Sequence, residues 1–145
     1  MVNNKFEIEI NASAARVWQA LTHTTMLEKW MKNVKVETDW KQGSTIIYTC
    51  YDEKGDIFVW NGQKMVWEGI IRIFEENKEF TCSYPDKSTG LVEESYILET
   101  LSANKTKLFQ TQVFEQQEVA DAYQEGTLEM LNLLKAYVEA HHSHV

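Results

Sequence analysis

The sequence predicts an α+β fold in which a curved antiparallel sheet of six to seven strands wraps around one long C-terminal helix. Residues 34–114 show almost only strand-like patterns, separated by short turn-forming stretches. Residues 117–141 then carry a wide apolar stripe at helical spacing, which a sheet is needed to bury. With 145 residues the chain has room for one domain, spanning residues 1–145, with one core.

The N-terminal region is predicted to form one strand followed by two short helices. Apolar and acidic side chains alternate over residues 4–10, which is typical of a half-buried strand. Ser13 precedes apolar residues at helical spacing, so its hydroxyl is expected to cap the first helix. A second helix is expected over residues 25–31, with Thr24 as its cap.

Alternation and turn residues divide the middle of the chain into six further strands. Their predicted ranges are 34–39, 44–51, 64–74, 78–84, 92–101 and 105–114. The connections are short, so strands that follow one another are expected to pair antiparallel. Residues 56–63 allow two interpretations: an extension of a strand, or a loop over the mouth of the sheet in which Trp60 serves as a lid or an interface.

The last segment is the clearest helix in the sequence. Its apolar stripe consists of Val119, Tyr123, Gly126, Met130, Leu134 and Tyr137, broadened by Leu131, Leu133 and Val138. At 1.5 Å per residue this helix is about 36 Å long, enough to cross a small sheet. Trp18 and Trp30, on the inner side of the two short helices, are expected to be core residues rather than ligand contacts.

Charge and cysteine content exclude several classes of partner. Fourteen basic and 22 acidic residues give a net charge of −8 without any basic cluster, which argues against nucleic acid or a membrane surface as a partner. No run approaches the ~18 apolar residues of a membrane helix, and the N-terminus does not have the pattern of a secretory signal. Cys50 and Cys82 are therefore expected to be reduced thiols in a cytoplasmic protein. The four histidines lack the spacing of a zinc site, and neither a metal nor a cofactor is expected.

Four segments resemble the START-like, or Bet v 1-like, superfamily, and most closely the family named after the C-terminal domain of the activator of Hsp90 ATPase. They are IEINASAARVWQALT (residues 8–22), LEKW (27–30), WEGII (67–71) and NKTKL (104–108). The resemblance covers essentially the whole chain and implies the helix-grip fold, with a ligand cavity between sheet and helix. One departure is Asn104, where a glycine is usual in the family. Because members of the superfamily bind or process very different molecules, the resemblance does not determine the activity.

If the resemblance sets the register, alternation assigns one face of each strand to the helix. This face would carry Phe6, Ile8, Ile10, Ile46, Tyr48, Cys50, Met65, Trp67, Gly69, Ile71, Ile73, Phe80, Cys82, Tyr84, Val92, Glu94, Tyr96, Leu98, Thr106, Leu108, Gln110 and Gln112. Most of these residues are apolar. Glu94, Gln110 and Gln112 are the informative exceptions, whereas the apolar Phe109 and Val113 fall on the outer face.

Two interpretations of these three polar residues are open. They could form a polar patch that orients a ligand in an otherwise apolar pocket. Alternatively, a bulge shifts the register by one residue, or the side chains lie in water at the open end. The first interpretation predicts a ligand site made of Trp67, Tyr84, Glu94, Tyr96, Gln110, Gln112 and Met130.

Three functions remain open at this stage. The favoured one is a protein that binds a small apolar or amphipathic molecule, which rests on the fold resemblance and on the apolar inner face of the sheet. No catalytic motif such as GxSxG, GxGxxG or HExxH occurs. The second is an enzyme of the polyketide cyclase or aromatase type, with Glu94 or Tyr96 as acid or base and Tyr48 and Tyr84 as donors. The third is a chaperone or stress-response partner, and contact with a chaperone or a homodimer is left open.

Overall fold

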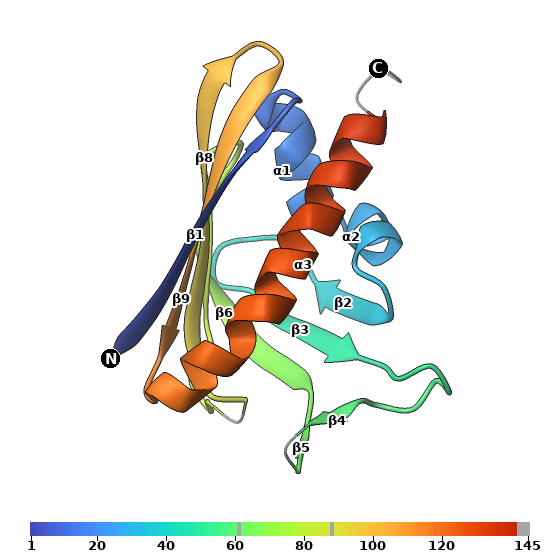
Figure 1. Ribbon diagram of the computed structural model, residues 1–145, viewed down its shortest axis with the longest axis vertical. Helices are drawn as coiled ribbons and strands as arrows, with labels where there is room; N and C mark the ends of the chain where they lie inside the picture. Colours follow the sequence, from blue (N-terminus) through green and yellow to red (C-terminus); the bar gives the residue numbers. More distant parts are fainter. Residues whose placement is uncertain (61, 88, 142–145) are drawn as a thin grey trace.

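The computed structural model describes residues 1–60, 62–87 and 89–141, and it has the predicted α+β helix-grip architecture. The elements are β1 (Val2–Ile10), α1 (Ala14–Thr22), α2 (Thr24–Trp30), β2 (Val34–Thr38), β3 (Thr45–Cys50), β4 (Val59–Trp60), β5 (Gln63–Lys64), β6 (Val66–Glu75), β7 (Glu79–Ser83), β8 (Leu91–Ser102), β9 (Lys105–Phe114) and α3 (Gln117–His141). Seven strands form one antiparallel sheet in the order β1-β9-β8-β7-β6-β3-β2. The sheet curves around α3, and α1 and α2 lie at one end of it (Figure 1).

The two short helices follow strand β1 as predicted, but only one of the predicted caps is present. The Ser13 hydroxyl accepts a hydrogen bond from the Arg16 amide at 3.3 Å, which confirms it as the cap of α1. Thr24 is not a cap, because α2 begins at Thr24 itself and its cap position, His23, makes no side-chain cap hydrogen bond. The Thr24 hydroxyl instead accepts from Trp40 Nε1 at 2.9 Å and so ties α2 to the loop after β2.

Two β-bulges change which side chains face the helix, and both were missed by simple alternation. A register shift between Ile71 and Ile73 turns Phe74 inward, so the predicted inward position of Ile73 is wrong. A second shift between Leu91 and Glu93 buries Leu91 in place of the predicted Val92. Each bulge inserts one residue into a strand, and one residue is enough to reverse the face of everything beyond it.

The segment over residues 56–63 leaves the main sheet. Strands β4 and β5 pair only with each other, and a single bridge joins Tyr51 to Ile57. In Figure 1 this hairpin projects beyond β3 and β6 at the end of the molecule opposite to α1. Phe58 and Trp60 on it are partly exposed, at 41% and 38%. The hairpin is thus a pair of its own, joined to the main sheet through Phe58, whose amide donates to the Cys50 carbonyl at 2.9 Å.

An aromatic cluster closes the end of the fold beneath α1 and α2. Trp18 packs on Phe74 with ring centroids 5.2 Å apart, and Phe80 stacks on Tyr96 at 6.1 Å. Trp30 is also buried, with its Nε1 donating to the backbone carbonyl of Ala20 at 2.8 Å. Trp18 and Trp30 are therefore core residues, as predicted.

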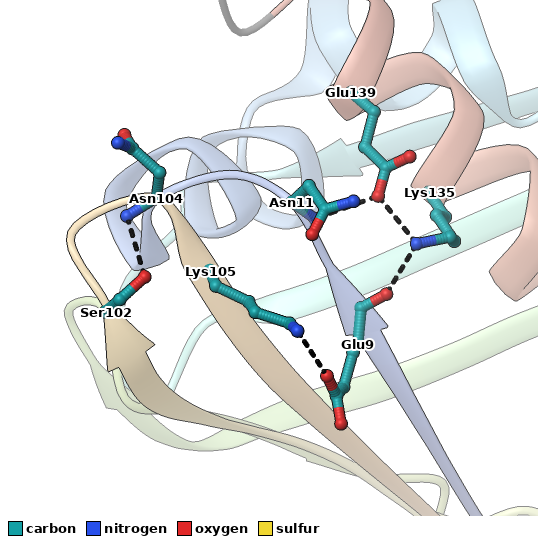
Figure 2. Close-up of polar contacts among 7 residues, drawn as sticks. All are labelled: Glu9, Asn11, Ser102, Asn104, Lys105, Lys135 and Glu139. Atoms are coloured by element: carbon teal, nitrogen blue, oxygen red, sulfur yellow. Dashed lines mark hydrogen bonds and ion pairs between the residues drawn. The ribbon is translucent and has the colours of Figure 1, made fainter.

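Polar contacts hold the C-terminal half of α3 at the end of β1 (Figure 2). Lys135 Nζ donates to the Glu9 carbonyl at 2.7 Å and pairs with Glu139 at 2.6 Å. Glu139 Oε2 also accepts from the Asn11 amide at 2.8 Å, and the Glu9 carboxylate pairs with Lys105 on β9. These groups are partly exposed, so each contact is individually weak, but together they keep α3 against β1 and β9. Toward the opposite edge of the sheet, α3 does not pack closely on strands β3 and β6, and a pocket remains between the helix and these strands.

Candidate ligand-binding site

A mostly apolar pocket of about 440 Å³ lies between α3 and the β3–β6 side of the sheet. The sheet side contributes Tyr48, Cys50, Met65, Trp67, Tyr84, Leu91, Glu94, Tyr96 and Gln112. The helix side contributes Ala122, Tyr123, Gly126, Thr127, Glu129, Met130 and Leu133, and Met31, Lys32, Val34, Phe58 and Trp60 complete the rim. This volume is within the range of small-molecule sites in proteins.

Small residues on α3 keep this pocket open. Ala122 and Gly126 are one helical turn apart and both line it. A Cβ atom added to Gly126 would meet no heavy atom within 4 Å. A larger residue at this position would therefore project into empty space, and the glycine leaves that space free.

A second glycine shapes the opposite wall. A Cβ atom on Gly69 would lie 2.6 Å from the Ser83 carbonyl oxygen and 2.8 Å from the ring of Tyr84. Only glycine lets the Tyr84 ring lie this close to β6, where it becomes part of the pocket wall. The WEGII segment identified in the sequence thus has a steric reason for its glycine.

The three polar residues singled out in the sequence do converge. Glu94 on β8 is the cross-strand partner of Gln112 on β9, and Tyr96 is the partner of Gln110. Gln110 Nε2 and Gln112 Nε2 donate to the same oxygen, Oε2 of Glu94, at 2.7 and 3.2 Å. The alternation holds here because both bulges of the β8–β9 pair lie outside this stretch. Phe109 is on the outer face as predicted, where Lys107 lies over its ring.

Six of the seven predicted site residues line the pocket, and Gln110 does not. Gln110 is wholly buried behind Glu94 and Tyr96, and its Nε2 reaches the hydroxyl of Tyr96 at 3.4 Å. Its Oε1 has no hydrogen-bond partner among the described residues. Gln110 therefore does not line the pocket itself but hydrogen-bonds to Glu94 and Tyr96, which do.

Two residues of the polar network were missed by the sequence analysis. Asn4 is buried and donates from Nδ2 to the Ala120 carbonyl at 2.7 Å and to Gln112 Oε1 at 3.4 Å. Thr127 on α3 accepts from Gln112 Nε2 at 3.0 Å. The signal for Asn4 was available, since it lies two residues before Phe6 on the same face of β1.

Burial sets the protonation of the groups around Glu94. Desolvation raises the pKa of the Glu94 carboxyl, and hydrogen bonds from Gln112, Gln110 and Tyr96 lower it by less. Burial also raises the pKa of Tyr48, Tyr84 and Tyr96 well above the usual tyrosine value, so these hydroxyls stay protonated. The site therefore combines one buried carboxyl group, that of Glu94, with several neutral hydroxyl donors, and the carboxyl group of Glu129 is exposed at its rim.

The two cysteines are free, as predicted, but their surroundings differ. Cys82 is buried, whereas Cys50 is half-buried and lines the pocket, so its predicted position among core residues is only partly right. Strand β6 lies between their strands, β3 and β7, which puts them about 10 Å apart at two interstrand spacings. Burial raises the pKa of both thiols. A disulfide cannot span this distance.

The sequence and the fold both match known proteins. A sequence model of the family described as activator of Hsp90 ATPase homolog 1-like protein matches residues 11–139. The chain belongs to this family. Membership agrees with the START-like, or Bet v 1-like, superfamily that the sequence resembles. A search of curated proteins found no match.

Solved structures of other members of this fold superpose on nearly the whole chain. A protein from Cytophaga hutchinsonii matches with a TM-score of 0.72 and 23% identity, covering 97% of this chain and 95% of the other. The Aha1 dimer from Colwellia psychrerythraea matches with a TM-score of 0.70 and 26% identity, covering 96% and 97%. The AHSA1-like protein from Aeromonas hydrophila matches with a TM-score of 0.70 and 16% identity, covering 94% and 93%.

Residues 1–60, 62–87 and 89–141 contain neither a candidate metal site nor a candidate membrane-spanning helix. No group of three or more histidine, cysteine, aspartate or glutamate side chains is arranged to hold a metal ion there. Of the predicted C-terminal histidines, His142 and His144 lie outside the described residues. In the same part of the chain no helix is both long and apolar enough to cross a bilayer.

Proposed function

We propose that this chain binds a small amphipathic molecule in the pocket between the sheet and α3. The observation that carries the proposal is the position of Glu94 and Gln112, a polar pair on one wall of a mostly apolar pocket of about 440 Å³. An apolar body would pack against Trp67, Tyr84 and Met130, and a polar head group would meet the pair. Aromatic walls with few, fixed polar groups are typical of small-molecule sites.

Native mass spectrometry of the protein purified from its own host tests the proposal directly. We expect a retained small molecule that is released on denaturation. Gly126→Leu should abolish this retention, because the new side chain projects into the pocket without meeting other atoms. Glu125→Leu is the matched control, since it adds the same side chain to an exposed neighbour on α3 that does not line the pocket. Equal retention in both variants would contradict the proposal.

An enzyme of the polyketide cyclase or aromatase type is the second candidate. It is favoured by one observation: a carboxyl group with a raised pKa, Glu94, lines the pocket together with the hydroxyl of Tyr96. Such a group can act as a general acid or base near neutral pH. Under this alternative Glu94→Gln would lose turnover while the protein still binds its substrate. Under the binding proposal no turnover is lost.

The family also suggests protein partners for this chain. The Colwellia psychrerythraea relative is described as a dimer, and we propose a homodimer here, supported by the partly exposed apolar residues Phe58, Val59 and Trp60 on the β4–β5 hairpin. Light scattering at micromolar concentration tests this, with Trp60→Ser expected to give a monomer.

A chaperone contact follows only from the family description, and pull-down with purified Hsp90 tests it. A cytoplasmic location is supported by the two free cysteines.

A further inference from the structure

We infer that the head group of the ligand is a cationic amine and that Glu94 is the carboxylate that binds it. The inference rests on the proposed function and narrows it to one chemical class. It starts from the hydrogen-bond directions around Glu94 and from the absence of a positive partner for its carboxylate among the residues that the structure describes.

The backbone of α3 determines which way the buried amides point. The Ala120 carbonyl can only accept a hydrogen bond, so the Asn4 atom 2.7 Å from it must be the donating Nδ2. This same Nδ2 lies 3.4 Å from Gln112, which therefore turns its Oε1 toward Asn4. The amino group of Gln112 is then directed at Thr127 and at Glu94. A flipped Gln112 would place two donors against each other.

The side-chain amides of Gln110 and Gln112 donate hydrogen bonds that stabilise a negative charge on Glu94. Its Oε2 receives N–H donors from both Gln110 and Gln112, and the Tyr96 hydroxyl adds a further hydrogen bond. Donors of this kind stabilise the ionised carboxylate over the neutral acid. The side chains around Glu94 therefore favour an anion in a place where burial disfavours one.

Residues 1–60, 62–87 and 89–141 do not supply the matching positive charge. None of the ion pairs formed by the described residues includes Glu94. Lys32 is the only lysine or arginine among the described residues that line the pocket, and it is exposed at the rim, as is the oppositely charged Glu129. A buried carboxylate without a counter-charge is destabilising.

A protonated amine completes this arrangement better than other head groups do. It brings the missing charge and N–H donors for the free lone pairs of the carboxylate. The aromatic walls, which include Trp67 and Tyr84, also favour a cation over an anion. A hydroxyl group would leave the charge of Glu94 unpaired, and a carboxylate would be repelled by it.

Within the described part of the chain, no other buried group near Glu94 changes charge around neutral pH. Tyr48, Cys50, Cys82, Tyr84, Tyr96 and Tyr123 are the titratable neighbours, from β3, β7 and the loop after it, β8 and α3. Burial raises the pKa of each, so all are neutral there. Lys32 and Glu129 are the exposed charged residues at the rim of the pocket. The preference for an amine should therefore decline as the solution is acidified and Glu94 takes up its proton.

Three probes with one apolar body test the inference: phenylbutylamine, phenylbutanol and phenylbutyrate, titrated by calorimetry at neutral pH. The amine should bind at least about tenfold more tightly than the alcohol, and the acid most weakly. Glu94→Gln should weaken amine binding by about tenfold and leave alcohol binding within about twofold, which also shows that the variant is folded. Glu93→Gln, on the opposite face of the same strand, is the matched control and should bind all three probes like the unsubstituted protein.

The outcomes separate this inference from the proposed function. Equal affinity for amine and alcohol, or tighter binding of the acid, would overturn the amine assignment while leaving the pocket as a binding site. An amine preference that persists in Glu94→Gln would show that another group binds the positive charge, and this result would also overturn the amine assignment to Glu94. Failure of all three probes to bind, or binding that Gly126→Leu does not block, would count against the pocket itself.

Discussion

Glu94 and Gln112 face each other directly across the β8–β9 pair, and Gln112 Nε2 donates to Glu94 Oε2 at 3.2 Å. Both side chains point to the inner face of the sheet, where a polar pair is unusual. The amide relieves part of the desolvation of the carboxyl group but carries no charge. This pairing gives the pocket a polar wall, and it has consequences for stability that can be measured.

Replacing Glu94 by glutamine should change how stability depends on pH. The folded pKa of Glu94 is raised by burial, so the unfolded chain gives up this proton first as the pH rises. Between the unfolded pKa, about 4.3, and the higher folded one, the unfolded state binds fewer protons, and the free energy of unfolding falls with increasing pH. Glu94→Gln removes this loss. In urea unfolding, the free energy of unfolding of Glu94→Gln should increase relative to that of the wild type as the pH rises from acidic to neutral. Glu93→Gln should show no such increase.

Asn4→Asp should be strongly destabilising. The aspartate offers no donor to the Ala120 carbonyl and places its own oxygens beside Gln112 Oε1, so acceptors face acceptors. We expect a loss of about 3 kcal/mol, and about 1–3 kcal/mol for Asn4→Ala, from urea unfolding. Asn3→Asp, on the exposed face of β1, is the control and should stay within about 0.5 kcal/mol. Similar losses at positions 3 and 4 would show that the Asn4 contacts are not stabilising.

Gly69→Ala should destabilise the fold by about 1–3 kcal/mol, because the added methyl group overlaps the Ser83 carbonyl and the Tyr84 ring. The backbone oxygen cannot move away easily, so the strands or the ring must shift. Thermal unfolding measures the loss, and near-ultraviolet circular dichroism reports a change in the aromatic surroundings. A variant as stable as the wild type would show that β6 and β7 are further apart than described.

Gly126→Ala should have the opposite effect. The glycine lies inside α3, and its added Cβ meets nothing within 4 Å. Alanine reduces the conformational freedom of the unfolded chain and is favoured in helices, so we expect a gain of about 0.5–1 kcal/mol. Chemical unfolding provides the value. A loss of stability would mean that the helix needs glycine at this point for a contact absent from the present structure.

The two thiols should react in a fixed order. Cys50 lines the pocket and is half-buried, whereas Cys82 is buried in the sheet. Burial raises the pKa of both, which keeps the reactive thiolate scarce at neutral pH. Alkylation followed by mass spectrometry should show slow labelling of Cys50 first and of Cys82 only on unfolding. A pocket ligand should protect Cys50, and rapid labelling of both thiols in native buffer would contradict this arrangement.

Much of the site could be predicted from alternation once the family resemblance had set the register of the strands. The inward positions of Glu94, Gln110 and Gln112 follow from counting along β8 and β9, and the structure confirms that these three residues come together. What alternation cannot show is where a strand gains a residue. The bulges at Ile71–Ile73 and Leu91–Glu93 depend on how neighbouring strands twist past each other, so Phe74 and Leu91 took the places expected of Ile73 and Val92.

The sequence by itself determined the order of elements, the span of α3 and the cap at Ser13, because these depend on local periodicity and on side chains close in the chain. Only the tertiary structure decided that α3 packs on β1 and β9 and stands away from β3 and β6, which creates the pocket. It also decided that the Ala120 carbonyl orients Asn4, Gln112 and finally Glu94. The two contacts of Asn4 join residues more than a hundred positions apart. The physical reason they cannot be predicted from the sequence is that their geometry exists only once sheet and helix have packed.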